Sequence, residues 1–402
     1  MNKIEIITPV HVGTGDKIEA PCFYRENNDD IVAKRYLFTD ILSQMPTSVL
    51  TNNYFLKQLA SKQSNKNELY KNIDRYVNYS KLNELYSVKD DNEKDISESG
   101  YDVYEQVKDL NKPYIPGSSI KGALLNAWFY FLLKVNFNKD TTEKNIRRIF
   151  SSKNPDKFTI INYLFEDGTD HSNFMKALYS CLVCRDVYFD KMEVLWAERI
   201  GSGKDYKGPT IPISYRECIR SNQSVNSEFM FIDENKKNLI LSDLDSYIKK
   251  DLDEQEKDKI KKEYENILND FKQSTFYNAC NVFTEDVLKE DQKYKNIYRF
   301  YNCENVNHQV DELLQEIAHT KQNKEKVAYL RIGNSTNYFS KTITLLIRDK
   351  APSLYKEYFD NVLSPNSKSK TRANKDTLPK TRTVYSSYDK QYLPGFIKIY
   401  YD

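Results

Sequence analysis

The chain has 402 residues, of which 39% are hydrophobic and 29% are charged, and it contains 31 tyrosines and 20 phenylalanines. This composition predicts a folded protein and excludes extended disorder, while the length favours two or three folding units or one core with insertions. Lys and Arg total 60 against 58 for Asp and Glu, so any nucleic-acid site must be local.

The cysteines and the apolar runs indicate where in the cell the protein is expected. Six cysteines follow no regular spacing, and we expect no signal peptide in a chain that begins Met-Asn-Lys-Ile-Glu. We therefore expect reduced thiols and a cytoplasmic location. The longest apolar run, Ala123–Val135, is interrupted by Asn126 and Lys134 and is too short to span a bilayer. We therefore expect no membrane-spanning segment.

The N-terminal region is predicted to contain a strand, a glycine loop and a hairpin. Apolar and polar residues alternate at the start of Ile4–Val12, which is typical of a strand. The strand runs into His11–Gly15, whose two glycines favour a flexible loop. Cys22–Arg25 and Ile31–Ala33 flank a polar run and predict a hairpin.

Two long segments are predicted to be helical insertions. Asp40 is a plausible N-cap for the first helix of residues 40–110, a segment that ends in an acidic, serine-rich stretch. Residues 241–326 are rich in Lys, Glu and Asp at helical spacing and contain no proline. This pattern is typical of a largely helical, solvated insert.

Residues Tyr114–Trp128 form the most informative segment. Pro116 and Gly117 favour a sharp turn into a helix, and Ser118 or Ser119 can cap its first turn. The apolar residues of this helix have the spacing of one buried face and are Ile120, Ala123, Leu124, Ala127, Trp128, Phe131 and Leu132.

The start of this helix is a candidate anion site. Its first backbone N–H groups, the positive end of the helix dipole and Lys121 together suit a phosphate of a nucleic-acid backbone. Gly122 is expected to let another backbone approach closely. A capped core helix that binds no ligand explains the same pattern equally well.

The middle of the chain is predicted to contain short strands, at Val183–Phe189, Thr210–Tyr215 and Glu228–Ile232. Arg199 and Lys204 lie between two of them, beside glycines, and can either grip an RNA backbone or belong to a plain solvated loop. A nucleotide-binding P-loop is excluded here, because Glu198 and Asp205 stand where that motif needs Gly and Ser or Thr.

A second candidate phosphate site follows the predicted strand Val327–Ile332. Its loop leads into a predicted helix, Tyr338–Ile347, and can present backbone N–H groups to phosphate. The polar and basic residues of this site are Arg331, Asn334, Ser335, Asn337 and Lys341. An ordinary connection between a strand and a helix is the alternative interpretation.

The C-terminal part is predicted to end in a strand, Phe396–Tyr400. Residues 364–382 precede it and form a flexible loop that contains the densest positive stretch of the chain. This loop can contact RNA, or it can simply keep the protein soluble.

Three segments together resemble a known family. Tyr114–Leu124, Thr8–Gly15 and Leu393–Ile397 are similar to the signature segments of the RAMP superfamily of CRISPR proteins. Together with a fourth element, Leu330–Lys341, their order over nearly the whole chain is most similar to the terminal backbone subunit of type III-A (Csm) effector complexes. The segment at Gly333 departs from the glycine-rich loop of the family, because Asn and Ser replace the other glycines.

The resemblance implies an α+β fold with a ferredoxin-like (RNA-recognition-motif-like) core, formed by residues 1–39, 111–240 and 327–402, and large helical insertions. It also implies a non-catalytic subunit that caps the backbone filament, holds the 3′ region of a CRISPR RNA (crRNA) and supports crRNA maturation, assembly and antiviral defence. The implied partners are crRNA, target RNA and neighbouring Csm subunits, with no cofactor or metal. Residue chemistry and resemblance together predict RNA contacts at His11, Gly13, Gly15, Gly117, Ser118, Ser119, Lys121, Arg199, Lys204, Arg331, Asn334, Ser335 and Lys341.

An RNA-cutting enzyme is the alternative hypothesis. His11 lies where a metal-independent endoribonuclease of the same superfamily could use it as a general base on CRISPR repeat RNA. Asp16 and Glu19 are the nearby carboxylates that target slicing would need, or else they are exposed loop acids. Cys181 and Cys184 have a zinc-like spacing without a second pair, so we interpret them as core cysteines.

Overall fold

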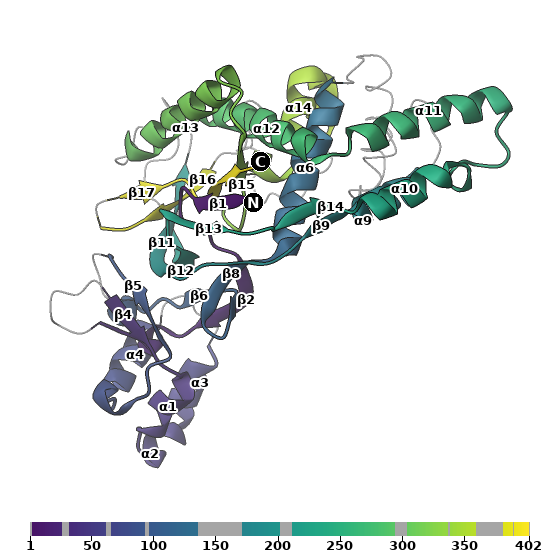
Figure 1. Ribbon diagram of the computed structural model, residues 1–402. Helices are drawn as coiled ribbons and strands as arrows, with labels where there is room; N and C mark the ends of the chain where they lie inside the picture. Colours follow the sequence, from purple (N-terminus) through teal and green to yellow (C-terminus); the bar gives the residue numbers. More distant parts are fainter. Residues whose placement is uncertain are drawn as a thin grey trace.

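The computed structural model describes residues 2–25, 32–61, 66–92, 96–135, 171–201, 211–293, 304–336, 338–358, 381–388 and 390–401. The protein is α+β, as predicted. Figure 1 shows an upper lobe in which helices cover a sheet, a smaller lower lobe and a helical arm that extends from the upper lobe. The arm consists of α9 (Ser172–Cys181), α10 (Glu234–Ser242) and α11 (Glu254–Asp270).

A four-stranded sheet in the upper lobe brings the two ends of the chain together. Its strands are β13 (Gln223–Asn226), β1 (Lys3–Ile6), β18 (Phe396–Tyr400) and β15 (Val327–Arg331), in this order, and every neighbouring pair is antiparallel. The predicted strand at Phe396–Tyr400 is therefore confirmed. Helices α6 (Gly117–Val135) and α12 (Gln273–Lys293) share one hydrophobic core with this sheet, which gives the two layers of a ferredoxin-like core.

Helix α12 closes the outer edge of this sheet. The amide of Asn281 donates to the carbonyl of Val327 and accepts from the N–H of Tyr329, both at 2.8 Å. The hydroxyl of Thr284 donates to the carbonyl of Tyr329 at 2.8 Å. The free backbone groups of edge strand β15 thus find partners on a buried helix. The expectation that residues 241–326 are solvated is wrong for α12.

A second, nine-stranded sheet runs from the upper lobe into the lower lobe (Figure 1). The order along it is β2-β6-β12-β11-β5-β4-β3, and β16, which also pairs with β17, lies on β11. The hairpin of β3 and β4 confirms the prediction, whereas β11 and β16 were not predicted. The strands are β2 (Gly13–Ile18), β3 (Phe23–Arg25), β4 (Val32–Arg35), β5 (Tyr86–Lys89), β6 (Val103–Gln106), β11 (Met192–Gly201), β12 (Ile211–Ile219), β16 (Thr381–Ser386) and β17 (Gln391–Tyr392).

The lower lobe has its own core beneath β3, β4 and β5, into which Tyr70 and Ile73 are buried. Residues 40–110 contribute strands to the second sheet, so this segment is not only helical. The predicted N-cap at Asp40 is wrong, because Asp40 lies inside the first turn of its helix and Leu37 is the N-cap. The helices of this lobe are α1 (Phe38–Ser43), α2 (Thr47–Leu50), α3 (Asn53–Leu59), α4 (Asn67–Asp74) and α5 (Ile96–Ser99).

The remaining elements complete the upper lobe. The predicted helix Tyr338–Ile347 is a 3-10 turn, Tyr338–Lys341, followed by a separate α-helix.

The described cysteines are free, and no described group of His, Cys, Asp or Glu could hold a metal ion. Within the described ranges no helix is long and apolar enough to cross a membrane. The other elements are β7 (Lys108–Asp109), β8 (Lys112–Ile115), β9 (Leu182–Cys184), β10 (Val187–Tyr188), β14 (Met230–Ile232), α13 (Glu304–Gln322), α14 (Thr344–Lys350) and α15 (Pro352–Tyr358).

Candidate nucleic-acid interface

Three segments that are far apart in the sequence meet at one end of the four-stranded sheet. The N–H of Asn334 donates to the carbonyl of His11 at 2.7 Å. The N–H of Gly395 donates to the carbonyl of Pro9 at 2.9 Å, and the N–H of Ile332 donates to the carbonyl of Gly395 at 2.7 Å. The predicted N-terminal loop, the loop after β15 and the segment before β18 therefore form one cluster, which we call the loop cluster.

Glycines allow the backbones of the loop cluster to approach each other. Gly333 has a φ of +94°, and a Cβ at this position would lie 2.6 Å from the carbonyl oxygen of His11. A Cβ at Gly13 would lie 2.8 Å from the His11 ring and 3.3 Å from the Asn334 side chain. Asn334 is exposed and Ser335 has a φ of 65°, so the cluster presents mainly backbone and small polar groups to solvent.

His11, one of the residues predicted to contact RNA, has a buried side chain. The residue is 1% exposed, and its Nδ1 donates to the carbonyl of Glu217 at 2.6 Å. Burial lowers the pKa of His11 to about 4, and the nearby cation of Arg216 acts in the same direction. Among the described residues, Nε2 has no hydrogen-bond partner. His11 can therefore contribute only backbone groups to the surface of the loop cluster.

A buried carboxylate that the sequence did not reveal lies behind the loop cluster. Glu217 is fully buried, and it accepts hydrogen bonds from the Tyr86 hydroxyl at 2.6 Å, the Gln106 N–H at 3.1 Å and the Lys108 ammonium at 2.5 Å. These three donors satisfy the hydrogen-bonding capacity of a carboxylate that lies in the interior. The carboxylate thus connects β12 to β5, β6 and β7.

Gln106 connects the loop cluster to the start of α6. Its side-chain oxygen accepts the N–H of Val12 at 2.8 Å, and its side-chain nitrogen donates to the carbonyl of Tyr114 at 3.0 Å. Tyr114 belongs to β8, which leads directly into α6. The two predicted RNA-binding segments are therefore linked through one buried amide.

The start of α6 differs from the predicted anion site. The N–H of Gly117 donates to the carboxylate of Asp186 at 2.7 Å, and the N–H of Ser119 donates to the carbonyl of Pro116 at 2.9 Å. A carboxylate from another part of the chain thus occupies the place predicted for a phosphate, and it caps the helix instead of a serine. The side chains that remain accessible to RNA here are those of the exposed Ser118 and the half-buried Ser119 and Lys121.

The two glycines of the α6 motif have different roles from those predicted. A Cβ at Gly117 would lie 2.4 Å from the backbone oxygen of Cys184, whereas a Cβ at Gly122 would meet nothing within 4 Å. We expect Gly117→Ala to destabilise the fold by about 1–3 kcal/mol, because backbone would have to shift. Gly122→Ala, the matched control, should stabilise it by up to about 1 kcal/mol through helix propensity. Urea unfolding measures both, and equal effects would contradict this assignment.

Arg331 does not face solvent, which corrects its predicted role. It is 6% exposed, its Nε donates to the carbonyl of Pro394 at 2.9 Å, and its Nη1 lies 3.5 Å from the carboxylate of Asp291. Lys341 is exposed, although partial burial by the surrounding chain and the cation of Arg331 lower its pKa. Lys204, Asn337 and the side chain of Arg199 lie outside the described residues, as does nearly all of the basic segment 364–382.

Comparison with known proteins places this fold in a family. A sequence model of the RAMP superfamily matches residues 3–339. The chain belongs to the RAMP superfamily. A chain of the cryo-EM structure of a Csm–crRNA–target RNA ternary complex from a type III-A CRISPR-Cas system is similar, with a TM-score of 0.63 and 18% identity over 99% of this chain and 100% of that one. The crystal structure of Csm5 from T. onnurineus is also similar, with a TM-score of 0.55 and 16% identity over 98% and 99%. A search of curated proteins finds no match.

The surface of this RAMP protein carries a cation–aromatic strip next to the loop cluster. Lys17 of β2 and Arg216 of β12 both pair in register with Tyr104 of β6. The Lys17 ammonium lies 4.8 Å and the Arg216 guanidinium 4.6 Å from the centre of the Tyr104 ring. Sequence spacing could not reveal this strip, because the three residues come from three separate parts of the chain.

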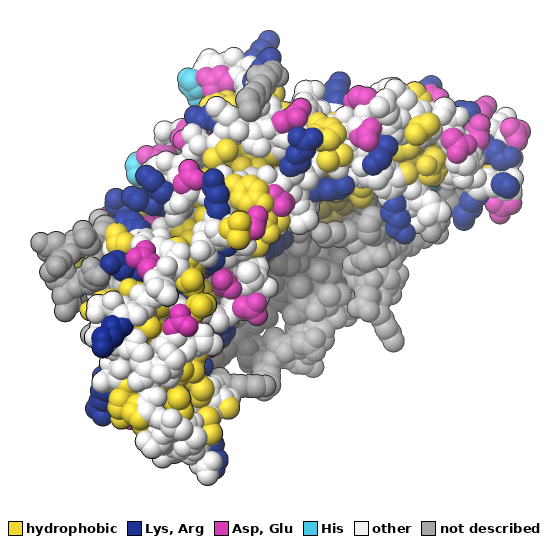
Figure 2. Space-filling model, turned by 60° about the horizontal axis from the view of Figure 1, so that its bottom comes forward, with side chains coloured by type: hydrophobic (Ala, Val, Ile, Leu, Met, Phe, Trp, Pro, Cys, Tyr) yellow, Lys and Arg dark blue, Asp and Glu magenta, His cyan; other side chains and the backbone are white. Residues whose placement is uncertain are grey.

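Charge alone does not mark an RNA-binding face in this RAMP protein. Figure 2 shows Lys and Arg side chains interspersed with Asp and Glu over the face that it displays, including the arm. This mixture agrees with the formal net charge of +2. A nucleic-acid site here has to rely on local groups such as the strip of Lys17, Tyr104 and Arg216.

Proposed function

We propose that this chain is a non-catalytic RNA-binding backbone subunit of a type III-A CRISPR interference complex. It caps the backbone filament, holds the 3′ region of the crRNA, and supports crRNA maturation and assembly for antiviral defence. Its partners are the crRNA, the target RNA in the assembled complex and the neighbouring Csm subunits. The similarity to a subunit of a Csm–crRNA–target RNA complex over both full chain lengths supports this assignment.

The loop cluster is the observation that carries the proposal. It joins three segments by backbone hydrogen bonds and presents backbone and small polar groups, including exposed Asn334 and Gly15, to solvent. Such a surface can hold a sugar-phosphate backbone without reading the bases, which leaves a guide strand free to pair. The exposed cation Lys17 lies on the strand that starts in this cluster.

The structure offers little support for the nuclease alternative. A general base must reach the proton that it removes, yet His11 is buried and its pKa is lowered to about 4. Asp16 is exposed, and its N–H donates to the Thr14 hydroxyl at 3.0 Å in a local turn. Glu19 is half-buried just before a short 3-10 turn.

Replacing Lys121 and Lys341 together by alanine is expected to weaken guide retention in the assembled complex. Each lysine that contacts a phosphate should contribute about one unit to the slope of log affinity against log salt, so the double variant should have a shallower slope. The loss should be similar for guides of different sequence, because phosphate contacts carry no sequence information. Guide RNA per purified complex, measured across a salt series, provides the test.

The matched control is the double replacement of Lys249 and Lys250, two exposed lysines of the arm. It removes the same formal charge and should leave guide retention unchanged. Equal loss in both double variants would indicate a general charge effect. Full retention by the Lys121 and Lys341 variant at every salt concentration would remove these lysines from the proposed interface.

A further inference from the structure

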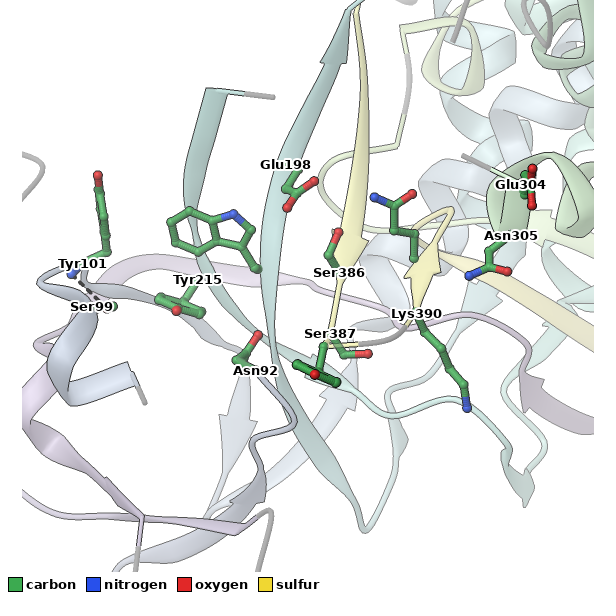
Figure 3. Close-up of a pocket in the computed structure, with 13 residues that line it drawn as sticks. Asn92, Ser99, Tyr101, Glu198, Tyr215, Glu304, Asn305, Ser386, Ser387 and Lys390 are labelled. Carbon is green, nitrogen blue, oxygen red and sulfur yellow. Dashed lines mark hydrogen bonds between the residues drawn. The ribbon is translucent and has the colours of Figure 1, made fainter. Parts of the chain in front are cut away.

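A pocket lies over the second sheet, where it is lined by residues of β12, β11 and the hairpin of β16 and β17. It has a volume of about 730 Å³, within the range of sites that enclose small ligands. Figure 3 shows its residues coming from four parts of the chain: Asn92 and Tyr101 from the lower lobe, Tyr215 and Glu198 from the sheet, Ser386 and Lys390 from the hairpin of β16 and β17, and Glu304 and Asn305 from the start of α13. None of these residues belongs to the loop cluster.

The floor of this pocket is a row of four side chains across four neighbouring strands. In register, Tyr215 pairs with Trp196, Trp196 pairs with Ser386, and Ser386 pairs with Gln391. Residues directly opposite each other in antiparallel strands project from the same face of a sheet. The row therefore changes from two aromatic residues to two polar ones within a distance of about 14 Å, three strand spacings.

The polar half of the row carries unused hydrogen-bonding capacity. Ser386 is 7% exposed, and neither its Oγ nor the Oε1 of Gln391 has a hydrogen-bond partner among the described residues. Polar atoms in such shielded positions are normally satisfied, and an orphaned one destabilises the fold. Two such atoms side by side in a pocket floor indicate a ligand with donor groups along one edge.

The aromatic half of the pocket offers flat surfaces at the floor and the rim. The Trp196 ring lies 4.6 Å from the ring of Tyr215 and 5.4 Å from the ring of Tyr101, in edge arrangements that leave it half-buried. Tyr388 lines the rim and is 72% exposed, while its backbone N–H donates to the carbonyl of Asp91 at 2.7 Å. That bond holds the hairpin tip against the lower lobe.

We propose that this pocket binds one unpaired nucleobase. The base would stack on the aromatic half, and its exocyclic and ring N–H groups would donate to Ser386 and Gln391. The carboxylate of Glu198 disfavours a phosphate inside the pocket, whereas the exposed Lys390 provides a cation at the hairpin. The assignment rests on the proposed RNA-binding function and adds a base-binding site separate from the loop cluster.

Tryptophan fluorescence of the full chain tests this site. The chain has two tryptophans, and Trp128 is fully buried in the main core, so quenching by an added ligand reports on Trp196. We expect uridine and adenosine monophosphates or a short single-stranded oligoribonucleotide to quench the signal saturably. Ribose 5-phosphate, which lacks a base, should not. Saturation by mononucleotides identifies a diffusible nucleotide, and saturation only by the oligonucleotide identifies a base of an RNA strand.

Two variants and one matched control sharpen the test. Tyr388→Ala should raise the dissociation constant about tenfold through loss of a stacking surface. Tyr54→Ala, at a residue of α3 that is 65% exposed and lies outside the pocket, should change nothing. Ser386→Ala should also weaken binding without lowering the melting temperature, because the hydroxyl that it removes has no hydrogen-bond partner within the part of the chain that the structure describes.

Several results would overturn the pocket assignment. They are the absence of quenching by every base-containing ligand, quenching by ribose 5-phosphate, or an equal effect of Tyr54→Ala and Tyr388→Ala. If the Lys121 and Lys341 double variant loses guide RNA but its fluorescence is still quenched normally, the pocket and the phosphate-binding lysines are separate sites. Normal guide retention without any quenching rejects the base pocket alone, whereas quenching in a chain that never retains a guide rejects the proposed function alone.

Discussion

Replacing Asp291 by alanine is expected to lower the free energy of unfolding by about 3–5 kcal/mol, the usual range for removing one partner of a buried ion pair. Asp291 is 5% exposed, and its carboxylate lies 2.6 Å from the Arg382 Nε and 3.5 Å from the Arg331 Nη1. Both arginines are also buried, so alanine would leave two guanidinium groups without this counter-charge. Urea unfolding of the purified chain measures the change.

The same substitution at an exposed ion pair is the matched control for Asp291. Asp245 lies 3.0 Å from the Lys261 ammonium, with side-chain exposures of 79% and 40%. Asp245→Ala should therefore cost less than about 1 kcal/mol. A loss at Asp291 as small as that at Asp245 would show that other groups neutralise the two arginines.

The ion cluster around Asp291 also supports the candidate interface. Arg331 donates to the carbonyl of Pro394, the residue before Gly395, whose own backbone bonds to Pro9 and Ile332. The buried ion cluster around Asp291 therefore holds the Pro394–Gly395 side of the loop cluster in place. Because Asp291→Ala would release that side, we expect the variant to lose guide RNA as well as stability.

Elements with a strong local pattern were predictable from the sequence. Alternation at Ile4 and Ile6 and the apolar run in Phe396–Tyr400 indicate the paired strands β1 and β18. The apolar spacing from Ile120 indicates the buried face of α6, and Ile120, Leu124, Ala127 and Trp128 are all fully buried. Local pattern is sufficient in these cases because one face of each element meets the core.

Features that depend on distant partners were not predictable. Arg331 follows a strand and resembles a phosphate ligand until Asp291, 40 positions earlier, is placed beside it. Gly117 and Gly122 look interchangeable until the backbone of Cys184 approaches only the first of them. Strands β11 and β16 are defined by their pairing with each other and with β12 and β17, which come from other parts of the chain.

Acid is expected to destabilise the protein through His11. Burial lowers the pKa of His11 from 6.5 to about 4, so the unfolded chain binds a proton in this range that the folded chain does not. The neutral His11 ring contributes fully to the free energy of unfolding above about pH 6.5, and this contribution is lost as the pH falls. Since one pKa unit corresponds to about 1.36 kcal/mol, the loss should reach about 3 kcal/mol near pH 4.

Replacing His11 by asparagine tests this origin of the acid sensitivity. The asparagine amide can still donate to the Glu217 carbonyl in place of Nδ1, but it cannot take up a proton. The variant should lose some stability at neutral pH, because the smaller side chain leaves a gap, yet its unfolding free energy should fall less steeply with acid. The same substitution at His308, an exposed residue of α13, is the matched control and should retain the wild-type slope. Parallel pH profiles for the wild-type and His11→Asn proteins would assign the acid sensitivity to other groups.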